Sequence, residues 1–141
     1  LEPGTHEATV VAEGILQPNG LCFSPDEKIL YAVESRGVPS RKILAYDVTD
    51  GGRKIANKRV LIDAGPGTPD GMRCDADGNL WAGARPGVVV LSPDGATIGF
   101  IRLPEICANV CFGGVKRNRL FMAASQSLYA VHVNTQGAAP G

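Results

Sequence analysis

The sequence predicts an all-β protein of the β-propeller class, on the strength of three observations. Short apolar runs alternate with turns along all 141 residues, and the 18 Gly and 10 Pro are spread through those turns. Three segments are similar to one another: "PNGLCFSPDEKILYAVES", "PDGMRCDADGNLWAGA" and "ANVCFGGVKRNRLFMAAS". Each segment can be divided into antiparallel strands joined by hairpin turns, and repeated units of this kind are typical of propeller blades.

The expected strands follow in order within each repeat. First strands are predicted at 21–23, 72–74 and 110–112, and second strands at 29–34, 80–84 and 120–124. Third strands are predicted at 42–48, 87–93 and 127–133, and fourth strands only at 59–64 and 97–103. A β-sandwich is the alternative architecture. It would not explain why Pro-Asn-Gly and Pro-Asp-Gly recur just before the first strand, which lines the central channel in a propeller.

The repeats divide the chain into about three blades of one partial propeller, at 15–65, 66–104 and 105–141. Residues 1–14 contain a strand-like run at 7–13, which we expect to be the closing strand of a preceding blade. Closed propellers take about four to eight blades. We therefore expect this chain to be part of a longer polypeptide or to assemble with another chain, since three blades alone would leave open sheet edges.

Composition excludes several kinds of partner. The 14 basic and 14 acidic residues balance, so we expect neither a nucleic-acid nor an anionic-membrane partner. The longest apolar runs are too short for a transmembrane helix. The four cysteines form no Cys-x-x-Cys pair and lie mostly in apolar runs, which favours structural thiols. That pattern leans towards a reducing, cytoplasmic compartment, although a periplasmic location stays open.

The repeated Pro-Asn-Gly and Pro-Asp-Gly motifs supply the candidate site. Asn19 and Asp70 occupy equivalent positions in successive blades, so both side chains are expected at the channel mouth. Amide and carboxylate oxygens suit Ca²⁺ or Mg²⁺, and they also bind Zn²⁺ or Mn²⁺ less selectively. The glycine after each of them permits a tight backbone that an ion or a substrate can approach closely. The competing interpretation is two ordinary turns, because Asn, Asp and Gly are common turn residues.

The third repeat departs from this pattern. Ala108 falls opposite Asn19, and Asn109 is displaced by one position. Asn109 is therefore a weaker candidate, either for substrate binding from a shifted backbone or for capping a turn. Arg85 is a candidate cation at the rim, against the default of a solvated surface arginine.

Other motifs indicate structure rather than chemistry. "DADGN" at 75–79 resembles the start of a calcium loop but lacks the glutamate expected at position 86, so a hairpin turn is predicted. "GPGTPDG" at 65–71 lacks the ending of a phosphate-binding loop. The sequence contains no Gly-x-Ser-x-Gly elbow, which argues against a serine-hydrolase triad.

The ordered set "PNGLCFSPDEKILYAVES", "TPDGMRCDADGNLWAGA", "LPEICANVCFGG" and "RLFMAASQSLYAVHV" resembles the C-terminal half of a known family. This is the SMP-30/gluconolactonase/luciferin-regenerating-enzyme family, the regucalcin-type propellers of six blades. The resemblance implies one divalent metal at the channel mouth, Ca²⁺ first among the candidates. Its protein ligands would be Asn19, Asp70 and a glutamate of the first blade, which has no counterpart in this chain. The family's substrate-holding Arg and Asn also belong to the N-terminal half.

The resulting hypothesis is metal-dependent hydrolysis of a sugar lactone, a small-molecule ester. The chain would supply half of the site and would be active only when completed by the N-terminal half of the propeller. Asp70 would act as general base on the attacking water and Asn19 would hold the metal. The alternatives are a non-catalytic calcium-binding or ligand-binding propeller, or a fragment with a purely structural dependence on its N-terminal half.

Overall fold

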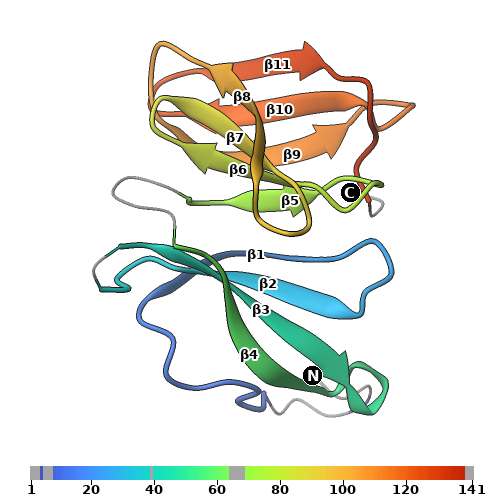
Figure 1. Cartoon of the computed structure of the whole chain (residues 1–141). Helices are drawn as coiled ribbons and strands as arrows, with labels where there is room; N and C mark the ends of the chain where they lie inside the picture. The colour runs from blue at the N-terminus through green and yellow to red at the C-terminus, as the bar shows by residue number, and fades with distance from the viewer. Residues whose placement is uncertain (1–3, 5–7, 39, 64–68, 139–141) are drawn as a thin grey trace.

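The computed structural model of the chain describes residues 4, 8–38, 40–63 and 69–138. These residues form three antiparallel sheets, each built from consecutive strands (Figure 1). The first sheet has the order β1-β2-β3-β4, with bounds Pro18–Phe23, Ile29–Glu34, Lys42–Thr49 and Lys54–Asp63. The second has the order β5-β6-β7-β8, with bounds Met72–Cys74, Leu80–Ala84, Gly87–Leu91 and Thr97–Arg102. The third has three strands, β9, β10 and β11, with bounds Cys107–Gly113, Arg119–Ala124 and Leu128–His132.

The predicted all-β fold and its division into sheets are confirmed. Within the described residues the third sheet shows three strands, as expected, and the two fourth strands of the other sheets are present. β4 begins five residues earlier than predicted, at Lys54, one residue after a short 3-10 turn at Asp50–Gly52. No helix in the described part of the chain has the length and apolar character needed to cross a membrane.

The leading strand predicted at 7–13 differs from the structure. Residues 8–13 form no strand, and residue 7 lies outside the described residues. Ala12 and Ile15 instead pack against a small cluster of Ala32, Leu44 and Tyr46 on one face of the first sheet. A strand needs a hydrogen-bonding neighbour, and the neighbour expected for this segment belongs to a blade outside the chain. Its role in closing such a blade stays a prediction.

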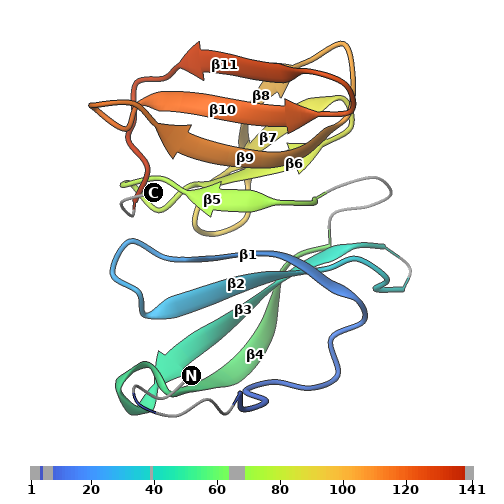
Figure 2. The ribbon, with the colours of Figure 1, turned by 180° about the vertical axis from the view of Figure 1, so that it is seen from behind.

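The sheets stack through their faces, with the first strands side by side. β1 lies next to β5, and β9 lies next to β5 and β6 (Figures 1 and 2). β4, β8 and β11 are the strands at the other edge of their sheets. One apolar cluster joins the first two sheets through residues such as Val33, Ile43, Met72 and Leu80. The three first strands therefore line one surface, as the inner strands of neighbouring propeller blades do.

A second apolar cluster joins the second and third sheets. It includes Trp81, Val88, Val110, Leu120 and Met122. The ring of Trp81 meets that of Phe112 edge to face, with centroids 5.6 Å apart. Because the second sheet is covered on both faces, β6 and β7 are nearly continuous apolar runs rather than alternating ones.

Candidate functional site

Each first strand carries a β-bulge at its N-terminal end. In β1, Asn19 and Gly20 together oppose the single residue Val33, because the register runs from Pro18↔Glu34 to Leu21↔Ala32. In β9, the register between Asn109↔Ala123 and Cys107↔Ala124 leaves Ala108 as the extra residue. Bulges of this kind bend a strand and re-aim its side chains, and they are common beside functional sites.

The entry to β5 follows the same plan. The amide of Asp70 donates to the carbonyl of Gly83 at 3.0 Å, and the amide of Gly83 donates to the carbonyl of Gly71 at 2.9 Å. Two consecutive residues thus bond to one residue of the neighbouring strand, which is the pattern of a bulge. All three candidate residues, Asn19, Asp70 and Asn109, lie at or next to these irregularities.

The glycines of the repeated motif bring the three entries into contact. A Cβ on Gly20 would overlap the carbonyl oxygen of Asp70, and a Cβ on Gly71 would overlap the side-chain amide of Asn109. The amide of Gly71 also donates to the carbonyl of Ala108 at 2.8 Å. Glycine is needed here because the neighbouring inner strand occupies the space of a side chain. The structure therefore brings the backbone of Gly20, the residue after Asn19, against that of Asp70, with the Asn109 side chain beside Gly71.

The candidate side chains differ in exposure and in partners. Asn19 and Asn109 are exposed, and Asp70 is half-buried. Asn109 Oδ1 accepts a hydrogen bond from the amide of Val110 at 2.9 Å. Within the described part of the chain, the Asn19 amide and the Asp70 carboxylate have no hydrogen-bond or ion-pair partner. Their oxygens are thus available to a ligand.

A cavity of about 390 Å³ opens beside Asp70, and we call it the mouth cavity. It is lined by Arg41, Asp70, Gly83, Ala84, Arg85, Ile106 and Cys107. Burial raises the pKa of the Cys107 thiol, and the negative charge of the nearby Asp70 acts in the same direction. That cysteine is therefore a neutral wall residue rather than a reactive thiolate.

Arg41 was not expected from the sequence, whereas Arg85 was a candidate cation at the rim, with a solvated surface arginine as the default. Arg41 Nη1 donates to the carbonyl of Pro69 at 3.1 Å, which places its guanidinium next to the Pro-Asp-Gly motif. Arg41 directly precedes β3 and Arg85 directly follows β6, so both come from the loops between second and third strands. The repeat alignment could have paired these two loops, although their lengths differ.

The segment leading into β1 is fixed by a buried acid that sequence reasoning also passed over. Glu34, at the end of β2, is buried, and its Oε2 accepts a hydrogen bond from the amide of Leu16 at 3.0 Å. The amide of Ser35 donates to the carbonyl of Gln17 at 3.1 Å. These bonds hold the chain immediately before Asn19.

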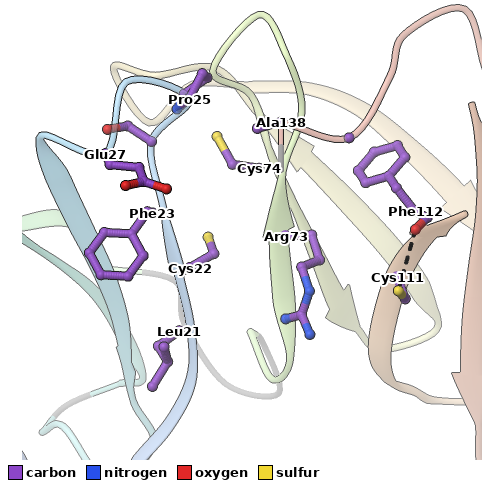
Figure 3. Close-up of a pocket in the computed structure, with 12 residues that line it drawn as sticks. Leu21, Cys22, Phe23, Pro25, Glu27, Arg73, Cys74, Cys111, Phe112 and Ala138 are labelled. Atoms are coloured by element: carbon purple, nitrogen blue, oxygen red, sulfur yellow. Dashed lines mark hydrogen bonds between the residues drawn. The ribbon is translucent and has the colours of Figure 1, made fainter. Parts of the chain in front are cut away.

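A second cavity, of about 340 Å³, lies along the exposed surface of the first strands and is called the wall cavity (Figure 3). Leu21, Phe23 and Arg73 line it, together with the buried thiols of Cys22 and Cys74 (Figure 3). Burial raises the pKa of each of these two thiols to about 12. None of the three predicted site residues lines this cavity.

The turn at 75–79 is structural, as predicted. Asp75 is completely buried, and Oδ1 accepts hydrogen bonds from the amides of Asp77 and Asn79 at 3.0 and 2.8 Å. Oδ2 accepts from Asn79 Nδ2 at 3.0 Å and from Trp81 Nε1 at 2.9 Å. The Asp75 carboxylate is fully used inside the protein, so it offers nothing to a cation.

Whether a divalent cation can bind at the strand entries depends on the oxygen ligands that the side chains offer there. Hard cations prefer carboxylate and amide oxygens. Asp70 and Asn19 carry such oxygens, and Gly20, the residue after Asn19, lies against the Asp70 backbone. Among the described residues, no group of three or more His, Cys, Asp or Glu side chains could hold a metal ion. The chain thus presents a partial set of ligands of the right chemistry.

Comparison with known proteins gives the family. The model of the SMP-30/gluconolactonase/LRE-like region matches residues 1–126. A gluconolactonase of Zymomonas mobilis is 34% identical over 137 residues, which cover 91% of this chain and 38% of that protein. A regucalcin of Xenopus laevis is 35% identical over 115 residues, covering 76% of this chain and 37% of that protein.

The fold is shared with solved structures. A gluconolactonase of Xanthomonas campestris superposes with a TM-score of 0.76 at 33% identity, over 85% of this chain and 39% of that one. The sheets of this chain correspond to about 40% of a six-bladed propeller, so the predicted partial propeller is confirmed. The chain spans about two-fifths of the length of these relatives. On these grounds, this chain belongs to the SMP-30/gluconolactonase/LRE-like family.

Proposed function

We propose that this chain contributes the metal-binding and proton-transferring half of a lactonase site, which hydrolyses a sugar lactone. The observation that carries the proposal is the contact between the Asn19–Gly20 and Asp70–Gly71 backbones, with the Asp70 carboxylate free of partners in the described chain. Relatives that carry the names gluconolactonase and lactonohydrolase support the reaction class. The substrate and the activity of a complete propeller are part of the proposal, since the chain spans only part of those relatives.

Asn19 and Asp70 would hold the divalent cation, with Ca²⁺ the first candidate. Its remaining ligands would come from water and from the N-terminal half of the propeller, because Ca²⁺ takes six to eight oxygens. When bound, the cation supplies Lewis-acid polarisation of the lactone carbonyl. The rest of the chemistry falls to the protein.

Asp70 is the residue that we assign to proton transfer. Its carboxylate takes a proton from a water molecule as the water oxygen attacks the carbonyl carbon of the lactone. The bond between that carbon and the ring oxygen then breaks, and the ring oxygen leaves as a hydroxyl group with the proton returned by Asp70. Water and lactone thereby give one hydroxy acid. Asn19, an amide without a titratable proton, binds and orients only.

The test is lactone hydrolysis by the complete propeller formed by this chain and its N-terminal half. Asp70→Ala should lower kcat/KM at least 100-fold, the lower range of a general-base contribution. Asp77→Ala is the matched control, because it removes an exposed carboxylate seven residues away that does not line the mouth cavity. Near-normal rates for Asp70→Ala would disprove the assignment.

Asp70→Asn separates the chemistry from binding, since it keeps an oxygen ligand and removes the base. Retained cation affinity with lost turnover supports an enzyme. Cation binding by a complete propeller that hydrolyses no lactone would instead support the non-catalytic calcium-binding alternative.

A further inference from the structure

We infer that Arg41 and Arg85 form an anion subsite in the mouth cavity, which Asp70 also lines. The inference rests on the proposed function and specifies its ligand: a lactone with an acidic substituent, or the carboxylate that ring opening produces. Both sources present the same chemistry, an anion at the rim of the site.

The charge balance of the mouth cavity favours an anion. Two guanidinium groups line it against the single carboxylate of Asp70. Neither arginine makes an ion pair with any residue that the structure describes. Once Asp70 binds a cation, its charge no longer offsets the arginines, so the attraction for an anion rises.

Arg41 is held by a hydrogen bond to the backbone, and Arg85 by its place in a hairpin. Arg41 donates through Nη1 to the carbonyl of Pro69 at 3.1 Å, and its other N–H groups have no partner among the residues that the structure describes. Arg85 lies in the tight hairpin that joins β6 to β7, where Ala84 pairs with Gly87. A guanidinium held in this way binds carboxylate, sulfonate or phosphate oxygens in pairs.

The cavity has the size of a small-molecule site. Its volume of about 390 Å³ lies within the roughly 300–1,000 Å³ of ligand pockets. Ile106 and Ala84 give it apolar wall, while Arg41, Arg85 and Asp70 provide the few polar groups that fix a ligand's orientation. A sugar-sized ring with one anionic end matches this lining.

The experiment compares Arg41→Gln and Arg85→Gln in the complete propeller. Arg36→Gln is the control for Arg41: it lies in the same loop, is exposed and does not line the cavity. Arg102→Gln serves likewise for Arg85, because Arg102 pairs with Gly87 at the end of β8 and lies outside the cavity. Thermal unfolding of each variant checks that it is folded.

Two kinetic readouts separate the two sources of the anion. The first readout compares kcat/KM for glucaro-lactone, which carries a carboxylate, with kcat/KM for glucono-lactone, which does not. If the anion belongs to the substrate, each cavity variant lowers the ratio of the first value to the second by about tenfold, a typical loss for a charge-assisted contact. If the product carries it, the ratio holds and the inhibition constant of gluconate rises by a similar factor. Variants that match their controls in both readouts would overturn the inference.

Failure of the proposed function would be visible separately. Should the complete propeller hydrolyse no lactone, calorimetric titration with inorganic sulfate still tests the subsite. Weaker sulfate binding by the two cavity variants than by Arg36→Gln and Arg102→Gln supports it, and equal binding overturns it.

Discussion

Asp70 and Asp75 stand at opposite ends of β5, five residues apart, in contrasting surroundings. Asp75 is completely buried, and its two oxygens accept four hydrogen bonds, one of them from the Trp81 indole. Asp70 is half-buried, and its carboxylate has no partner in the described chain. In the sequence the two look alike, because Asp70 is followed directly by a glycine and Asp75 is followed two residues later by Asp-Gly. The structural carboxylate of Asp75 has all of its acceptor capacity used inside the protein, whereas that of Asp70, the proposed site residue, is left open to a ligand.

The largest effect on stability is expected at Asp75. Asp75→Ala leaves the buried Trp81 indole and three turn donors without an acceptor, which should lower the free energy of unfolding by about 3 kcal/mol or more. Urea denaturation followed by Trp81 fluorescence measures the loss. Asp77→Ala, in the same turn but exposed, should change stability by less than about 0.5 kcal/mol. Asp70→Ala should behave like Asp77→Ala, and a loss as large as that of Asp75→Ala would erase the contrast between the two carboxylates.

A smaller effect is expected where the strands meet at the mouth. Gly71→Ala forces a methyl group against the Asn109 amide and the carbonyl of Ala108. Overpacking of this kind costs about 1–3 kcal/mol, and it should also weaken cation binding by spreading the strand entries. Gly99→Ala is the control, since its Cβ would meet Val90 at an ordinary 3.5 Å. Equal stability of the two variants would show that the entries are looser than the structure indicates.

The smallest effect on stability is expected from the buried thiols of Cys22 in β1 and Cys74 in β5. Burial raises the pKa of Cys22 to about 12, and the charge of Cys74 adds to the shift. An unfolded thiol titrates near 9, so above pH 9 the unfolded state loses a proton that the folded state keeps. Stability is therefore unaffected below pH 9 and falls as the pH rises towards 12.

The matching measurement is denaturation at pH 8 and pH 10. Each buried thiol should contribute about 1 kcal/mol to the loss between pH 9 and 10. Cys22→Ala should therefore have a weaker pH dependence than Cys111→Ala, which removes an exposed thiol. Identical pH dependence would mean that Cys22 is accessible to solvent in the folded protein.

Much of the fold and part of the site could be predicted from the sequence. The repeats predicted the order of the strands. The equivalence of the two motifs predicted that their entries lie side by side, and Gly20 does lie against the Asp70 backbone. The position of Asn109 was open because a bulge at Ala108 displaces it by one residue, and bulges leave little trace in apolar alternation. Arg41 was missed because its place depends on a hydrogen bond to Pro69 from a loop 28 residues away.

The proposed site requires above all that Asn19 and Asp70 bind one and the same cation. Calorimetric titration of the complete propeller with Ca²⁺ tests this with Asn19→Ala, Asp70→Ala and the double variant. Two ligands of one ion are coupled, so each single variant should lose at least tenfold in affinity, and the double variant should lose clearly less than the sum of the two free-energy changes. Unchanged affinity for Asn19→Ala, or losses that simply add, would contradict the shared site.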